Sequence, residues 1–252
     1  MKPDKETNDM SNSVLIAHCG ASKVDREFLK TLPVPEATRT HQPIPHIHIV
    51  EALLETLRFR HITVVADKYA VTSDGMRCFG LLQLEYGFEG VQFAIGFRNS
   101  NDKSLRLAMT VGYRVLVCDN LAFKGDFTPV LAKHSKSLNL VDVVSVGVDK
   151  IQRNFEPLKT QIRDWHDYIL DDRSVKEIIY DAFLDSKLDL PRTLLPAIHG
   201  FYFEPKAEEF LPRTLWSLSN AFTSAFKALK PVKQFQVTAK LGDFLEDYRM
   251  PF

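Results

Sequence analysis

Residues 91–123 read VQFAIGFRNSNDKSLRLAMTVGYRVLVCDNLAF, and this stretch contains the clearest strand pattern of the chain. Apolar residues alternate with small or polar residues from Val91 to Phe97 and again from Leu105 to Val111. Between the two runs lies the polar, turn-prone segment Asn99–Lys103. Alternation of period two on both sides of such a segment predicts an antiparallel hairpin.

The two faces of this hairpin differ in composition. Symmetric closure of the loop would place Ala94 opposite Ala108. One face is then wholly apolar and should be buried in a core; it contains Phe93, Ile95, Phe97, Leu107, Met109 and Val111. The other face combines small residues with arginines, namely Ala94, Gly96, Ala108, Thr110 and Gly112 with Arg98, Arg106 and Arg114.

Two interpretations of the small-residue face stay open. A helix could cover it, with the arginine side chains extending past the helix into solvent. Alternatively, an anionic ligand or a nucleic-acid backbone could lie across it, because arginine suits phosphate contacts. The second interpretation makes four cations the predicted nucleic-acid contacts: Arg98, Arg106, Arg114 and Lys124.

A set of polar side chains surrounds the same hairpin and continues past its second strand. Cys118 could act as a nucleophile if the following loop brought His134 within hydrogen-bond reach as a base. A free cysteine at a strand end is also commonly just a buried residue. The polar site candidates are Asn99, Asp102, Ser104, Cys118, Asp119, Asn120 and His134.

Two aspartates of this set are candidate ligands of a cation. Asp102 and Asp119 could share a divalent cation, but two carboxylates make a poor site without further oxygen ligands. A structural ion pair of these aspartates with Arg98 or Arg114 is the simpler interpretation. The short polar side chains of the Asn99–Asp102 loop can also hydrogen-bond their own backbone, which stabilises a tight turn.

Other sequence signals of metal or cofactor binding are weak. His46 and His48 follow prolines at the start of a predicted helix, where their side chains should diverge in capping or surface roles. The chain contains no GxxxxGK[ST], GxGxxG, HExxH or GxSxG motif. We therefore predict no metal and no cofactor.

The central residues also carry a family resemblance. They are Arg98-Asn99-Ser100, Asp102, Ser104, Gly112, Val117-Cys118-Asp119-Asn120 and Ala122-Phe123, flanked by Tyr69-Ala70-Val71-Thr72, Asp74-Gly75, Lys133-His134, and Thr214, Trp216, Asn220, Ala221 and Thr223. This pattern resembles a family of phage- and plasmid-like proteins catalogued as domain of unknown function number nine-three-two. Asn120-Leu121 departs from it, since many relatives have Asn-Gly there. The resemblance implies an association with mobile elements and supplies no reaction.

Composition sets the broad class. The chain has 252 residues, of which 45% are hydrophobic and 25% charged, with a formal net charge of zero, so any nucleic-acid binding must come from a local patch. Its three cysteines are widely spaced, which favours a reducing cytoplasm. No run approaches the ~18 apolar residues of a membrane span, so we expect no membrane partner.

The chain order predicts an α+β fold. An antiparallel meander of about four or five strands should follow one helix and precede a larger helical half. We expect a disordered tail over residues 1–13 and a single domain over residues 14–252, sheet-rich at 46–123 and helical at 139–248. Gly112 should bend or bulge the last strand.

The helices are predicted from apolar periodicity. Residues spaced alternately by four and three run from Val144 to Ile169, with a break expected at Pro157. Such a narrow seam favours a helical partner in the same or another chain, and we predict a homo-oligomer. The other predicted helices cover residues 25–29, 46–60, 175–184, 213–230 and 234–248, the last interrupted by Gly242.

Three functions are compatible with these observations. The first is a mobile-element-associated nucleic-acid-binding protein that binds or anneals single strands in replication, recombination or defence evasion. The second is an enzyme whose polar site contains Arg98, Asp102, Cys118, Asp119 and His134. The third is a structural protein that forms oligomers. The absence of catalytic motifs weighs against the second more than neutral charge weighs against the first.

Overall fold

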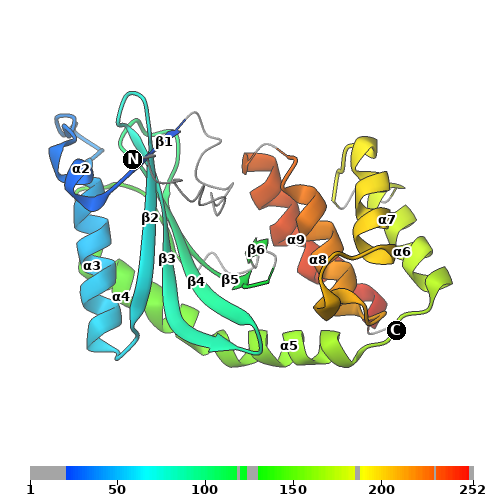
Figure 1. Ribbon diagram of the computed structural model, residues 1–252. Coiled ribbons are helices and arrows are strands. Elements are labelled where there is room, and N and C mark those ends of the chain that lie inside the picture. The colour runs from blue at the N-terminus through cyan, green and yellow to red at the C-terminus, as the bar shows by residue number, and fades with distance from the viewer. Residues whose placement is uncertain (1–20, 118–119, 124–129, 185–187, 230, 250–252) are drawn as a thin grey trace, which may run out of the picture.

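The protein is α+β, as predicted, with a helical C-terminal half (Figure 1). The computed structural model describes residues 21–117, 120–123, 130–184, 188–229 and 231–249. The first part contains β1 (Ala21–Val24), α2 (Arg26–Thr31), α3 (His46–Phe59), β2 (Val64–Thr72), β3 (Arg77–Phe88), β4 (Val91–Ser100), β5 (Leu107–Val115), β6 (Asn120–Phe123) and β7 (Val130–Ala132). The second part contains α4 (Leu140–Arg153), α5 (Phe155–Asp167), α6 (Asp172–Leu184), η1 (Arg192–Leu194), α7 (Leu195–Phe203), η2 (Glu208–Phe210), α8 (Leu215–Phe226) and α9 (Pro231–Arg249).

The strands form one antiparallel sheet in the order β1-β2-β3-β4-β5-β6, and β7 also pairs with β5. The predicted central hairpin is present, but its register differs from symmetric closure. Ala94 pairs with Gly112 instead of Ala108, and Arg98 pairs with Ala108. The shift is even-numbered, so each residue keeps its predicted face. Pairing also runs unbroken through Gly112, so β5 has no bulge there.

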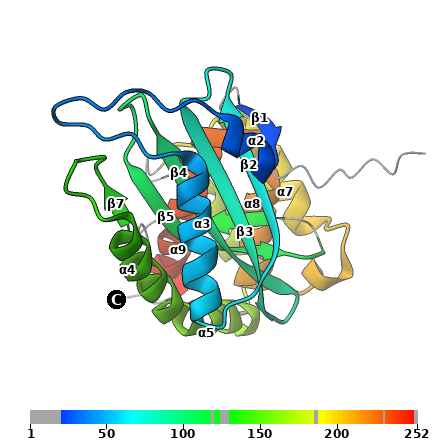
Figure 2. The same ribbon diagram turned by 90° about the vertical axis from the view of Figure 1, so that its left-hand side faces the viewer.

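The apolar face of the hairpin is buried as predicted. Phe93, Ile95, Leu107 and Val111 are fully enclosed, and Met109 and Phe97 nearly so. Figure 2 shows α3 and α4 lying across one face of the sheet. In Figure 1, α8 and α9 lie on the opposite side from α3, beside β6, and α5 runs between the two parts.

The predicted helical seam is satisfied within the chain. Its residues from Val144 to Trp165 are buried, whereas Ile169 lies beyond α5 and is 79% exposed. The break falls at Asn154, three residues before the predicted position. Pro157 instead occupies the first turn of α5, where a missing N–H costs little. The seam therefore no longer argues for association between copies.

Three segments were predicted less well. The short strands β6 and β7, from Asn120 onward, were not among the predicted elements. Between the helices predicted at 175–184 and 213–230 lies α7, which was not predicted and has a proline in its first turn. Gly242 does not interrupt α9. Within the described ranges, no helix is both long and apolar enough to cross a bilayer.

Gly80 leads to a stability prediction, because the Phe97 ring fills the space beside it. A Cβ at Gly80 would lie 2.0 Å from Phe97 Cε1, and that ring also packs near Tyr69, with ring centroids 6.2 Å apart. We expect Gly80→Ala to lower the free energy of unfolding by about 1–3 kcal/mol, measured by urea denaturation.

Truncating the obstructing ring tests the cause. Gly80→Ala should cost clearly less when combined with Phe97→Ala than alone, so the double-mutant cycle should show coupling. Gly242→Ala is the control, since its Cβ would meet nothing within 4 Å, and it should be neutral or stabilising. Equal costs of Gly80→Ala in both backgrounds would contradict this packing.

Candidate nucleic-acid interface

Arg98 belongs to a row of residues that crosses the sheet on the small-residue face. Directly paired residues of antiparallel strands point to the same face, so the registers define this row. It consists of Lys23, Ala70, Phe79, Arg98, Ala108 and Leu131, on β1, β2, β3, β4, β5 and β7. We call it the Arg98 row; at ~4.8 Å between strands, it is roughly 24 Å wide.

The Arg98 row is more open than the rows beside it. Leu81, Ala94 and Thr110, farther along the same face, are all buried. Within the row, Lys23 is exposed, Phe79 and Arg98 are partly exposed, and Leu131 is 49% exposed. A ligand could therefore reach this face at the hairpin-loop end of the sheet, and not across its small-residue centre.

Arg98 is the least compensated charge of the row. Its Nε is buried and has no hydrogen-bond partner in the part of the chain that the structure describes. Burial also lowers the pKa of the guanidinium. A buried donor without a partner is costly, and such a group in a native structure calls for an explanation. An anion that accepts hydrogen bonds from Arg98 would supply one.

The other predicted cations are not all close to Arg98. Arg106 is exposed and directly precedes β5, two residues before Ala108 of the Arg98 row. Arg114 pairs with Gln92 farther along β5, about 20 Å from Ala108 at ~3.3 Å per residue. Lys124 lies outside the described residues. Of the three predicted cations that the structure describes, Arg98 and Arg106 therefore lie at one end of the sheet, and the structure adds Lys23 there.

Asp102 has a structural role in the hairpin loop. Its Oδ2 accepts from Arg77 Nε at 2.7 Å, and its Oδ1 accepts from the Ser104 N–H at 2.9 Å and from the Ser100 hydroxyl. Partial burial acts to raise the pKa of this carboxyl, but the hydrogen bonds hold it well below its usual range. For Asp102, the ion pair predicted with Arg98 or Arg114 is wrong, because Arg77 neighbours the loop across the β3–β4 pairing and takes that carboxylate. Ser104 is exposed, with its hydroxyl 3.0 Å from that of Ser100.

Asn99 and His134 belong to a buried polar cluster on the opposite face of the sheet. Asn99 Nδ2 donates to Ile44 O at 3.0 Å and to His46 Nδ1 at 2.7 Å. His46 Nε2 in turn donates to Gly75 O at 3.0 Å, so the ring is the neutral tautomer with its proton on Nε2. His46 is thus buried and not in the predicted capping or surface role.

His134 completes this cluster. Its ring stacks on His41, with centroids 5.4 Å apart and planes at 11°. Both ring nitrogens of His134 are buried and without a hydrogen-bond partner among the residues described. Burial, together with His41 and His46, lowers the pKa of His134 to about 4. The ring is therefore neutral at pH 7, and its neighbours hold residues 38–46 against the sheet.

Asn120 lies at the other end of β5. It pairs with Val115, and its Nδ2 donates to Asn220 O at 3.2 Å and to Ser224 Oγ at 3.0 Å. It thereby ties β6 to α8. Cys118 and Asp119 lie outside the described residues.

The ends of β5 separate Asn120 and His134, two of the polar site candidates. Ala132, two residues before His134, pairs with Leu107, eight residues from Val115 along the strand. At ~3.3 Å per residue this is roughly 26 Å. Asn120 and His134 therefore do not share one site.

No other feature of the described chain presents a substrate or metal site. His46 is buried and His48 exposed, so the two side chains diverge as predicted. No group of three or more His, Cys, Asp or Glu residues suited to a metal occurs among the described ranges.

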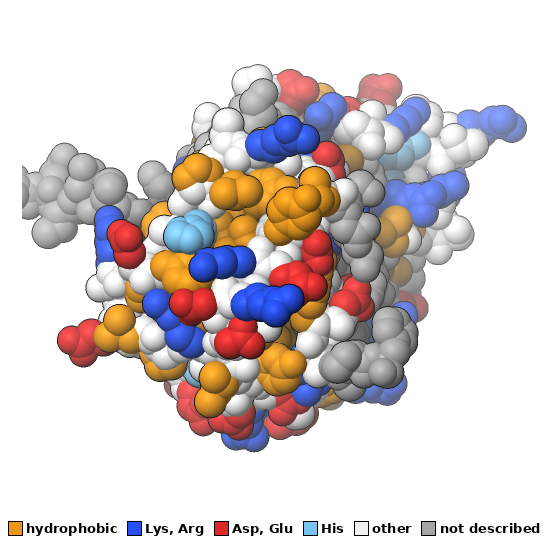
Figure 3. Space-filling view, turned by 90° about the vertical axis from the view of Figure 1, so that its right-hand side faces the viewer, with side chains coloured by type: hydrophobic (Ala, Val, Ile, Leu, Met, Phe, Trp, Pro, Cys, Tyr) orange, Lys and Arg blue, Asp and Glu red, His pale blue; other side chains and the backbone are white. Residues whose placement is uncertain are grey.

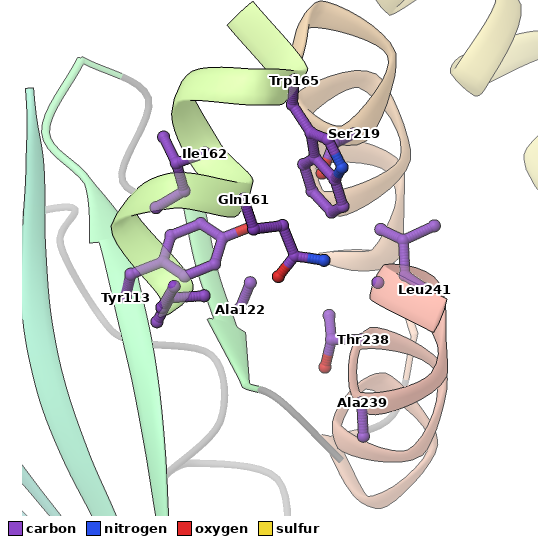
Figure 4. A pocket seen from close by; sticks show the side chains of 11 residues that line it. Tyr113, Ala122, Gln161, Ile162, Trp165, Ser219, Thr238, Ala239 and Leu241 are labelled. Atoms are coloured by element: carbon purple, nitrogen blue, oxygen red, sulfur yellow. The ribbon is translucent and has the colours of Figure 1, made fainter. Parts of the chain in front are cut away.

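A pocket lies between α5, α8, α9 and the β5–β6 pair (Figure 4). Of its polar lining residues, Gln161 and Trp165 both donate to Glu246 Oε1, at 3.1 and 2.6 Å. The enclosed space suits about one water molecule, whereas ligand pockets commonly measure about 300–1,000 Å³. We do not assign a substrate to it.

Sequence reasoning missed Lys23 and Phe79 as members of the row. Neither has a local signal, since Lys23 reaches Arg98 only through the pairings of β1, β2, β3 and β4. Comparison of the chain with protein-family models, with curated proteins and with solved structures gave no match in any of the three. The family resemblance thus stays a prediction, and a function has to be argued from the Arg98 row.

Proposed function

We propose that the protein binds nucleic acid, with single strands favoured, along the Arg98 row at the hairpin-loop end of the sheet. The observation that carries the proposal is the Arg98 guanidinium, whose buried Nε has no hydrogen-bond partner among the described residues. Arg98 is partly exposed, so a phosphate oxygen would accept a hydrogen bond from this guanidinium. Lys23 and Arg106, both exposed, supply further positive charge at the same end of the sheet, near the hairpin loop. The family resemblance would place this activity in mobile-element replication, recombination or defence evasion.

Phe79 supports a single strand as the ligand. It is partly exposed and directly opposite Arg98 on the neighbouring strand. Proteins that bind single strands combine aromatic side chains, on which bases stack, with cations that contact the backbone. A base in a duplex cannot stack on a side chain of a sheet surface without leaving its pair. The chain has zero net charge, so binding has to come from a local site, and Phe79 beside Arg98 is such a site.

The test is fluorescence anisotropy of a labelled single-stranded oligonucleotide at several salt concentrations. Arg98→Met should weaken binding to all sequences alike and reduce the slope of log K against log salt by about one unit, because one phosphate contact is lost. Phe79→Ala should weaken binding about tenfold at an unchanged slope, because stacking releases no counterions. Cys118→Ser should change little, whereas an enzyme dependent on that thiol would lose turnover.

Two controls make the result specific. Arg58→Ala removes an exposed cation of α3, on the helix that covers the other face, and should leave the salt slope unchanged. Arg98→Met should also unfold at an equal or higher temperature than the wild type, because it removes an uncompensated charge. Absence of binding at low salt, or equal effects of Arg58→Ala and Arg98→Met, would overturn the proposal.

A further inference from the structure

The outermost helices, α6 and α7, present an apolar surface. Figure 3 shows hydrophobic side chains gathered on this face, with Lys, Arg, Asp and Glu among them. On α6, Tyr180 is 59% and Leu184 55% exposed; on α7, Leu195 is 39% and Phe201 37% exposed. The sequence of α7, LPAIHGFYF, contains no charged residue. Helices that are apolar on all sides are normally enclosed, so this face is suited to a partner.

The exposed side of α6 has a regular charge pattern. Arg173, Glu177, Tyr180 and Leu184 are spaced by four, three and four residues and so form one stripe along the helix. All four are exposed, whereas Val175, Ile178, Ile179 and Ala182 on the other side are buried. Lys176 flanks the stripe on the side of α7, with its Nζ 5.8 Å from the centre of the Phe203 ring.

We propose that this face binds the same face of a second copy, with the two α6 helices antiparallel about a twofold axis between Lys176 and Glu177. In a twofold contact, if residue i meets residue j, then j also meets i. An axis at this position brings Lys176 to Glu177 of the second copy and Arg173 to Tyr180 of the second copy. The stripe together with Lys176 is therefore complementary to the same residues of the second copy, in charge and through a cation–π contact.

The ends of the stripe fit the same arrangement. The same spacing brings Leu184 towards Ile169 of the second copy, and Ile169 is 79% exposed just before α6. The α6 stripe alone is smaller than the ~800 Å² per partner of a standard interface. The adjoining exposed residues of α7 extend the apolar area on the side of Lys176. A second copy therefore accounts for both the charge pattern and the uncovered α7.

The proposal is independent of nucleic-acid binding. The sheet and α6–α7 lie on opposite sides of the molecule in Figure 1. Failure of either proposal therefore leaves the other in place.

Sedimentation velocity from about 1 to 100 µM tests the contact through a charge exchange. The wild type should approach twice the 28.8 kDa chain mass. Lys176→Glu and Glu177→Lys should each weaken association about tenfold at low salt, because each places like charges opposite one another twice. The double variant Lys176→Glu/Glu177→Lys should restore association. Leu184→Asp should remove it at unchanged circular dichroism.

The control is Lys150→Glu, which reverses an exposed charge on α4 and should have no effect. A wild type that stays monomeric at 100 µM would overturn the proposal. So would a dimer that the single variants do not weaken, or one that the double variant fails to restore, since either result places the contact elsewhere.

Discussion

Phe93→Ala should lower the free energy of unfolding by about 3–5 kcal/mol, the cost of removing a large aromatic ring from a packed core. Phe93 is fully buried and contacts rings from two other elements. Its centroid lies 5.1 Å from that of Phe155 on α5 and 5.4 Å from that of Tyr86 on β3. Truncation therefore leaves a cavity where the sheet meets the helical half.

Urea denaturation measures this loss from the midpoint and slope. Phe59→Ala is the matched control, because the same substitution on α3 removes a ring that is 82% exposed and should cost little. A loss below about 1 kcal/mol for Phe93→Ala, or equal losses for the two variants, would refute the assignment of this face to the core.

Acidification should destabilise the protein through His134. The pKa of His134 is lowered from 6.5 to about 4 in the folded protein, by burial and by the neighbouring His41 and His46. Between these two values the unfolded chain binds a proton that the folded protein does not. Stability is therefore unaffected above pH 6.5 and falls as the pH drops from 6.5 to 4. The full difference corresponds to about 3 kcal/mol.

Denaturation at pH 7.5, 6.5, 5.5 and 4.5 checks this expectation. His134→Gln should flatten the decline between pH 6.5 and 5, above the range where most carboxylates titrate. Part of the decline should persist, because burial also lowers the pKa of His46 against the opposing bond to Gly75. His48→Gln, at an exposed position, should follow the wild type. A pH profile that is the same for His134→Gln and the wild type would contradict a neutral buried ring.

The two proposed surfaces have different physical grounds. The proposal for the Arg98 row rests on a buried guanidinium nitrogen without a hydrogen-bond partner among the described residues. The proposal for the α6–α7 face rests on exposed apolar side chains. An association of two copies would carry two Arg98 rows on one particle, which would raise the avidity for a strand long enough to reach both. The charge-exchange variants would show whether binding and association are coupled.

The sequence by itself determined the elements and their buried faces. Alternation of period two over Val91–Phe97 defined the core side of β4, and periods of three and four defined α3, α4, α5, α6, α8 and α9, but not α7. These signals are local, because side-chain direction in a strand or helix follows from backbone geometry within a few residues. The predicted faces stay correct although the predicted register was wrong, because an even shift in the β4–β5 pairing leaves each residue on the same face.

Only the tertiary structure decided which functional groups meet. Arg98 and Asn99 are consecutive, yet one joins Phe79 on the small-residue face and the other joins His46 in the core. Asp102 pairs with Arg77 instead of the arginines nearer in the predicted hairpin. Strand pairing sets these contacts across distances that no local pattern records, because the register depends on the packing of the whole sheet. For that reason the polar set around the hairpin, compact in sequence, is divided in space between two faces and two ends of β5.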